Sequence, residues 1–221
     1  MPMALILCIE TATTNCSVAL AKDGVIVAFR EENNLKFSHS EKLHLFIEEV
    51  LQEVGIDNSE LDAIAVSKGP GSYTGLRIGV SAAKGLCFAL DIPLLAISTL
   101  KLLAQQVEEN NVYIVPMLDA RRMEVYSAVF DPENKIVRET KAEILNENSF
   151  AEYLKEKKTI FLGDGAKKFK SLCNNPNAIF LDDRFPSAMD MAALANDKYQ
   201  KKEIENLAYF EPYYLKEFML G

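Results

Sequence analysis

The order of strand-like and helix-like segments constrains this chain of 221 residues more than any other feature. Short apolar runs of strand length alternate with longer segments in which apolar residues recur at helical spacing. The second half of the chain repeats the order of elements found in the first half, without repeating its sequence. Strands that alternate with helices form largely parallel sheets with helices packed on both faces. The pattern therefore predicts a duplicated βββαβαβα arrangement, an α/β protein with two lobes.

The predicted elements place the boundary between the lobes next to residue 110. In the first half we expect strands at 4–10, 16–21, 25–30, 61–67 and 93–97, and helices at 41–54, 75–90 and 99–109. In the second half we expect strands at 112–118, 124–130, 136–140, 159–162 and 178–181, and helices at 150–155, 166–173 and 187–201. The resulting lobes are an N-terminal lobe over residues 1–109, with helices that bind a partner, and a C-terminal lobe over residues 110–221.

Charge and cysteine content narrow the class of protein. The chain has 24 Lys and Arg against 32 Asp and Glu, a net charge of −8, which opposes tight, sequence-independent contact with nucleic acid. The four cysteines lie far apart and form no CxxC pair, so we expect reduced thiols. The N-terminal apolar run ends at Glu10, too soon for a secretory signal, and no later run is long enough to span a bilayer. We therefore expect a cytoplasmic protein with no membrane partner.

A glycine-rich turn, Lys68-Gly-Pro-Gly-Ser-Tyr-Thr-Gly75, joins a predicted strand to a predicted helix. Backbone N–H groups at the start of a helix suit an anion, which makes the turn a candidate phosphate site. However, the spacing of Gly69, Gly71 and Gly75 matches neither the P-loop nor the GxGxxG fingerprint. The alternative is a tight turn that lets the helix lie close to the sheet.

The helix after this turn is apolar on two faces. At 100° per residue, one face holds Leu76 and Val80 and the other holds Ile78 and Ala82. Such a helix must be covered on both sides, once by its own sheet and once by helix 41–54 or a partner chain. From this pattern we predict a partner interface formed by His44, Leu45, Leu76, Gly79, Val80, Ala83 and Cys87.

Two polar turns occupy equivalent places in the two halves, and in two-lobed nucleotide-binding folds such turns face each other across a cleft. With the glycine-rich turn they give the candidate cleft or nucleotide-facing residues Glu10, Thr11, Thr13, Gly69, Gly71, Asp119, Arg121, Arg122 and Glu124. For the second turn the alternative is a solvated loop whose charges pair with one another. We expect no metal or other cofactor, because His39 and His44 lie about 140° apart around a helix. No nucleophile–base set is present either, so no catalytic residue is predicted.

Several blocks of the sequence resemble the TsaB (YeaZ) family. They are the segment Ile9-Glu-Thr-Ala-Thr-Thr-Asn-Cys-Ser-Val-Ala-Leu20, the pair His39-Ser40, the stretch from Lys68 to Leu86 with its Pro-Gly-Ser-Tyr-Thr-Gly-Leu-Arg core, Pro93–Ser98, Asp119–Tyr126 and Pro212–Leu215. The resemblance implies the actin-like ATPase superfamily (ASKHA, RNase H-like). It also implies a role in making N6-threonylcarbamoyladenosine next to the anticodon of tRNA.

The same resemblance implies the partners and the absence of catalysis. TsaB works with the metal-dependent transferase TsaD, whose His-x-x-x-His metal motif follows the strand that matches Pro93–Ile97. Here the corresponding residues, 98–103, read Ser-Thr-Leu-Lys-Leu-Leu and offer no metal ligand. The resemblance thus implies a non-catalytic subunit that binds a TsaD-like protein, helps to recruit a TsaE-like ATPase, forms a homodimer when alone and meets tRNA only indirectly. The alternative is an actin-like ATPase or small-molecule kinase with its own nucleotide cleft.

Overall fold

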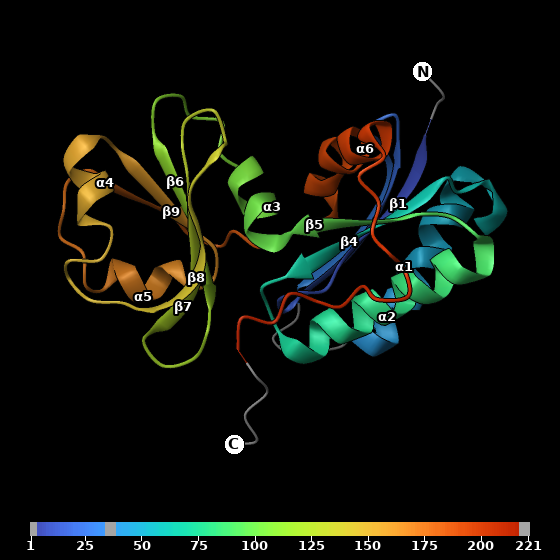
Figure 1. Ribbon diagram of the computed structural model, residues 1–221, viewed down its shortest axis with the longest axis horizontal. Coiled ribbons are helices and arrows are strands. Elements are labelled where there is room, and N and C mark those ends of the chain that lie inside the picture. The colour runs from blue at the N-terminus through green and yellow to red at the C-terminus, as the bar shows by residue number, and fades with distance from the viewer. Residues whose placement is uncertain (1–3, 34–38, 217–221) are drawn as a thin grey trace. The chain divides into compact units, whose positions relative to one another are not determined.

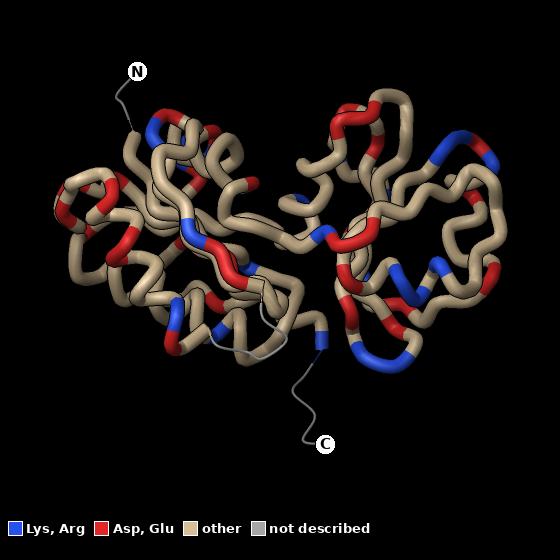
Figure 2. Tube along the Cα trace, turned by 180° about the vertical axis from the view of Figure 1, so that it is seen from behind, with Lys and Arg blue, Asp and Glu red and all other residues tan. Residues whose placement is uncertain are grey.

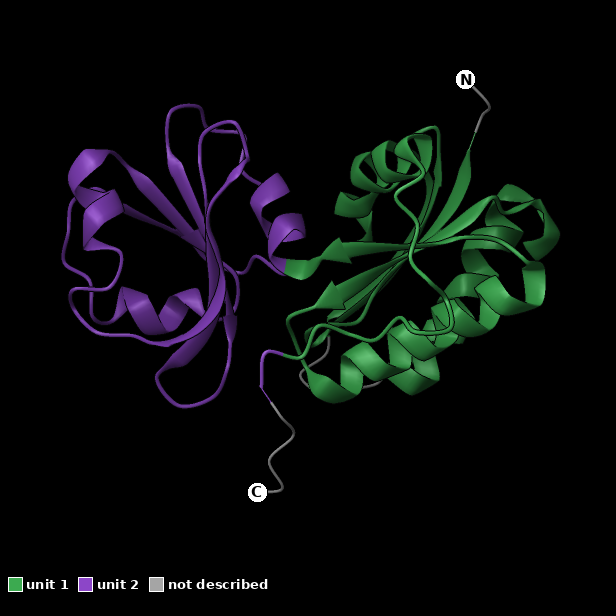
Figure 3. Cartoon of the chain, in the orientation of Figure 1, with its two compact units in different colours: residues 1–99, 186–214, 218–221 green, residues 100–185, 215–217 purple. Residues whose placement is uncertain are grey.

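The computed structural model of the chain describes residues 4–33 and 39–216 (Figure 1). The chain forms two compact units, each with its own sheet (Figure 3). Unit 1 holds the residues up to 99 together with 186–214, and unit 2 holds 100–185 with the described part of 215–217. Our predicted boundary at residues 109 and 110 differs from this division. The helix after residue 99 packs into unit 2, and the last helix of the chain packs into unit 1.

The sheet of unit 1 has the order β3-β2-β1-β4-β5. Its strands are β1 (Leu5–Glu10), β2 (Asn15–Lys22), β3 (Val25–Asn33), β4 (Ala63–Gly69) and β5 (Leu94–Ser98). The first three strands pair antiparallel, whereas β1, β4 and β5 run parallel. The helices α1 (His39–Val54) and α2 (Tyr73–Leu90) lie on one face (Figure 1). The other face carries α6 (Ala192–Lys201) and the 3-10 helix η2 (Ala188–Met191), while the 3-10 helix η1 (Asn58–Glu60) precedes β4.

Alternation along the strands sends side chains to the two faces of this sheet. In β1, Leu7 and Ile9 belong to the apolar core beneath α1 and α2. Cys8 and Glu10, which alternate with them, belong to the opposite face and are fully buried. Burial raises the pKa of the Cys8 thiol to about 12, so this thiol stays protonated and behaves as a small apolar side chain.

Unit 2 has the same strand arrangement, β10-β9-β6-β7-β8, which read from its other edge matches unit 1 strand for strand. Its elements are α3 (Thr99–Gln105), β6 (Tyr113–Asp119), β7 (Glu124–Phe130), β8 (Ile136–Ile144), α4 (Ala151–Glu156), β9 (Thr159–Leu162), α5 (Ala166–Lys170) and β10 (Ala178–Leu181). One apolar cluster lies between the sheet and α3, and another between the sheet and α4 and α5. The predicted α/β fold with a duplicated βββαβαβα order is confirmed.

The largest differences between predicted and observed element boundaries occur in three places. The helix expected to reach residue 109 ends at Gln105, where the next N–H groups bond three residues back, as at a tightening helix end. The strand expected at 136–140 continues to Ile144 because β7 offers a pairing partner along that whole length. The helix expected from residue 187 begins as η2, whose start is capped by the Ser187 hydroxyl, which accepts the Met189 N–H.

The glycine-rich turn brings the start of α2 against the loop between β1 and β2. The Thr11 hydroxyl donates to the Gly75 carbonyl at 2.8 Å, and the Ser72 N–H donates to the Ala12 carbonyl at 2.7 Å. A Cβ at Gly75 would lie 2.1 Å from the Thr11 carbonyl oxygen, and one at Gly79 would lie 2.2 Å from the Thr11 hydroxyl. These contacts leave no room for a side chain, so the glycines are required by backbone packing.

Two glycines of α2 provide a matched test of this packing. We expect Gly75→Ala to lower the free energy of unfolding by about 2 kcal/mol or more, because the new methyl group meets backbone. A Cβ at Gly85, farther along α2, would meet nothing within 4 Å, so Gly85→Ala should raise it by about 0.5–1 kcal/mol. Urea denaturation of both variants measures the effects, and equal shifts for the two would contradict the packing described here.

Candidate functional site

The inner face of α2 does not form the interface that the sequence predicts. Leu76, Val80, Ala83 and Cys87 are each less than 5% exposed, and the last three belong to the core of unit 1. Gly79 is also buried, against Thr11. These five residues face their own sheet, beside β4, so a partner cannot reach them. The prediction is corrected for them, whereas His44 and Leu45 on α1 are exposed.

The outer face of α2 is the second apolar face seen in the sequence. It carries the exposed Gly85 and Ala89 and the half-buried Ile78 and Ala82. Phe88 lies next to this face, in the helix sector that also holds Ser81 and Lys84, and is 83% exposed, which is unusual for so large an apolar side chain. Sequence analysis missed Phe88 as a site residue, although the outer face itself was visible in the spacing of the small residues.

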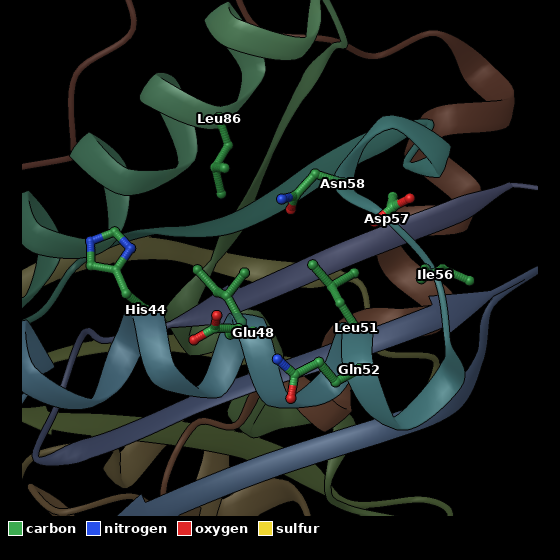
Figure 4. A pocket seen from close by; sticks show the side chains of 9 residues that line it. His44, Glu48, Leu51, Gln52, Ile56, Asp57, Asn58 and Leu86 are labelled. Atoms are coloured by element: carbon green, nitrogen blue, oxygen red, sulfur yellow. The ribbon is translucent and has the colours of Figure 1, made fainter.

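A groove runs between α1 and α2 beside this face (Figure 4). It has a volume of about 470 Å³, with His44 and Glu48 from α1 and Leu86 from α2 among its lining residues. Leu45, one position from His44, is 44% exposed. The outer face of α2, the groove and Leu45 are together called the α1–α2 surface below. Its apolar and small side chains suit the packing of another helix.

The predicted cleft residues of unit 1 are held in a tightly packed turn. Thr11 and Thr13 are almost fully buried, and the Thr13 carbonyl accepts a hydrogen bond from Nε2 of His39 at 2.6 Å. A Cβ at Gly71 would lie 2.5 Å from the Ala12 carbonyl oxygen, and one at Gly69 would lie 2.9 Å from that of Tyr213. The structure thus gives these residues packing contacts, and their nucleotide-facing role stays a prediction.

Glu10 is the most unusual group in this turn. Its side chain is fully buried on the η2 side of the sheet, and one carboxyl oxygen accepts the Ala12 N–H. The other oxygen, Oε2, has no partner in hydrogen-bond geometry in the described part of the chain. Burial raises the pKa of Glu10 to about 7, against the lowering effects of the Ala12 N–H and of the Ser67 hydroxyl, and nearby Asp190 adds a smaller rise.

This raised pKa predicts a pH dependence of stability. Between pH 4.5 and about 7, folded Glu10 keeps a proton that the unfolded chain releases, so the free energy of unfolding falls as the pH rises. Glu10→Gln removes this dependence, and at pH 8 the variant should be more stable than the wild type by up to about 3 kcal/mol. Urea denaturation at pH 5 and pH 8 tests it. A wild-type difference between the two pH values that persists in the variant would assign the effect to another group.

The predicted residues of unit 2 lie in the turn between β6 and β7. Lys168 of α5 donates to the Asp119 carboxylate at 2.8 Å, and Lys216 pairs with Glu124. Arg121 and Arg122 are both exposed at the tip of the turn. The alternative in which the charges of the turn pair with one another is therefore wrong for the two acidic residues, because their partners are lysines outside the turn.

Within residues 4–33 and 39–216, no group of three or more His, Cys, Asp or Glu side chains is arranged to hold a metal ion. No helix in these ranges has both the length and the apolar character needed to cross a membrane.

The comparisons with known proteins agree on one family. The family model described as TsaD, tRNA N6-adenosine threonylcarbamoyltransferase, matches residues 34–218. The tRNA threonylcarbamoyladenosine biosynthesis protein TsaB of Buchnera aphidicola subsp. Schizaphis graminum is 32% identical, over 93% of this chain and 99% of its own length. TsaB of Escherichia coli K12 is 29% identical, over 96% and 94% of the two chains.

Solved structures agree with these relatives. A Pseudomonas aeruginosa protein described as similar to peptidase YEAZ superimposes with a TM-score of 0.86 at 28% identity, over 97% of this chain and all of the other. YeaZ from the same organism gives a TM-score of 0.79 at 28% identity, over 96% of this chain and all of its own. The matched ranges include residues of both units. The chain therefore belongs to the TsaB (YeaZ) family, whose named members are tRNA threonylcarbamoyladenosine biosynthesis proteins.

Proposed function

We propose that this chain is a non-catalytic subunit of the complex that makes N6-threonylcarbamoyladenosine in tRNA. In this role it binds and activates a TsaD-like transferase in the cytoplasm and helps to recruit a TsaE-like ATPase. Without the transferase it forms a homodimer through the same surface. The named relatives support a role in threonylcarbamoyladenosine synthesis. The α1–α2 surface supports a role in binding a protein partner.

The exposed outer face of α2 is the observation that carries the proposal. Phe88 leaves 83% of its side chain in water, while small residues keep the neighbouring surface flat. Gly85 adds an independent indication, because nothing in the described part of the chain requires a glycine there. A glycine inside a helix costs about 1 kcal/mol relative to alanine, so its advantage must arise elsewhere. Close approach of a partner helix supplies that advantage.

The lack of ligating side chains supports a non-catalytic role. β5 ends at Ser98 and α3 begins at Thr99, where the resemblance to TsaD expects a metal-binding motif. Residues 98–103 contain no His, Cys, Asp or Glu. The hydroxyl groups of Ser98 and Thr99 and the amine of Lys101, at the mostly buried start of α3, are poor ligands for a catalytic metal. The transferase chemistry therefore falls to the partner.

The alternative, an ATPase or kinase with its own nucleotide cleft, draws less support from the geometry. In unit 1 the start of α2 is already capped by the Ser72 hydroxyl, which accepts the Gly75 N–H at 3.3 Å. The Thr11 and Ala12 backbone fills the space beside the glycines. A phosphate would have to displace these contacts. Calorimetry of the isolated chain with ATP and Mg²⁺ distinguishes the two functions, since strong binding with turnover would favour the alternative.

Substitution of Phe88 tests the proposed surface. We expect Phe88→Asp to weaken association with a TsaD-like subunit of the same cell by about 100-fold or more, because a carboxylate would be buried without a partner. Size-exclusion chromatography and calorimetry of the mixed subunits measure the loss. Val25→Asp is the matched control, since Val25 is 67% exposed on β3 of the same unit, away from the α1–α2 surface.

Gly85→Gln separates loss of binding from loss of folding. The added side chain enters open space in the monomer, so urea stability measured at concentrations where the wild type is monomeric should stay at or above that of the wild type. In the complex it would separate the two helices and prevent association. If Phe88→Asp and Gly85→Gln both bind like the wild type, another surface holds the partner and the proposal fails.

A further inference from the structure

The tip of the hairpin between β6 and β7 carries two arginines that the proposed function does not use. Arg121 and Arg122 are exposed, and in Figure 2 the tip is blue between red ends. We infer that this tip binds the phosphate backbone of tRNA through Arg121 and Arg122. The inference rests on the proposed function and extends it, because there the tRNA is met only through the partner subunits.

The acidic residues of the hairpin do not neutralise these arginines. Asp119 accepts from Lys168 and from the backbone N–H of Arg121, at 2.8 and 2.6 Å. Glu124 pairs with Lys216. Within residues 4–33 and 39–216, neither guanidinium group has a hydrogen bond or ion pair to an acidic side chain. Two adjacent positive charges are thus left to solvent.

The backbone of the tip is strained at both arginines. Arg121 has a φ of 69° and Arg122 a φ of 49°, both in the left-handed region. Glycine or asparagine adopts this region readily, whereas a residue with a long side chain costs about 1 kcal/mol. A turn selected only for folding would therefore carry other residues, and strain of this kind is concentrated at functional sites.

The chemistry of the pair fits a phosphate backbone. The guanidinium fork donates two parallel hydrogen bonds to phosphate oxygens and keeps its charge at any physiological pH. The chain as a whole carries a charge of −8, so most of its surface repels a polyanion. RNA can then contact only small basic regions of the surface. The hairpin tip is such a region, because no acidic side chain among the described residues neutralises its two arginines.

An acidic protein surface is the competing occupant. Met123 is 39% exposed next to the arginines, and Ile144, which pairs with Glu124 across the β7–β8 ladder, is 72% exposed. A protein partner would bury these apolar side chains, since the core of an interface excludes water. Phosphate contacts require only the charges. The two occupants therefore differ in their dependence on Met123 and Ile144 and on salt.

The test measures binding of unmodified tRNA to the complex of this chain with its TsaD-like subunit by fluorescence anisotropy over a range of KCl concentrations. We expect Arg121→Gln/Arg122→Gln to weaken binding about tenfold at low salt and to lower the salt slope by about 1.5 to 2. Arg121→Lys/Arg122→Lys should keep most of that slope. Lys155→Gln/Lys158→Gln, which removes two exposed charges elsewhere on unit 2, should change little.

Each remaining outcome decides against the inference. If the complex forms and the arginine variant binds tRNA with wild-type affinity and slope, the inference is overturned while the proposed function stands. If Met123→Ser/Ile144→Ser weakens tRNA binding as much as the arginine variant does, or if the arginine variant no longer joins its protein partners, the tip is a protein contact. If the wild-type chain does not join the TsaD-like subunit, the proposed function fails and takes the inference with it.

Discussion

The contact between the β1–β2 turn and the first turns of α2 is the constraint on which unit 1 depends. Because the Thr11 carbonyl occupies the place of a side chain at Gly75, α2 must lie close to the sheet at its N-terminal end. The Thr11 hydroxyl then fixes the rotation of the helix by bonding to the Gly75 carbonyl and filling the space next to Gly79. This rotation turns Val80 inward and Gly85 outward. The α1–α2 surface is therefore set by glycine contacts on the opposite side of the same helix.

The order of elements and the fold class were predictable from sequence, because strand and helix periods depend on local residue patterns. The face of α2 that meets the sheet was not assigned correctly, since both faces are apolar. Size distinguishes them: Leu76 and Val80 bury more apolar area than Ala82 and Gly85, and burial of that area favours the larger residues in the core. The smaller residues outside allow another helix to approach. The size of the side chains, in addition to their polarity, was therefore the sequence signal that distinguishes the inner face of α2 from its outer face.

Other features depend on contacts between distant parts of the chain, which no local pattern reveals. The Ala-rich segment that forms α6 follows unit 2 in sequence but packs on β1 and β5 of unit 1. The Asn15 amide donates to the Pro186 carbonyl at 2.9 Å and the Ala188 N–H donates to the Ser17 hydroxyl at 2.9 Å, which anchors this returning segment. The burial of Glu10 depends on the same return of the chain over β1, so its raised pKa was beyond sequence analysis.

Two features lower the stability of the isolated chain, and no contact among its described residues requires the residue types found there. Gly85 interrupts an exposed stretch of helix, and two consecutive arginines adopt the left-handed region, each at a cost of about 1 kcal/mol. Local choices that oppose the fold are expected where function requires them. The two lie in different units, Gly85 in unit 1 and the arginines in unit 2. A single contact within the chain therefore cannot offset both costs in stability. A partner helix accounts for the first under the proposed function, and the phosphate backbone of tRNA accounts for the second under the further inference.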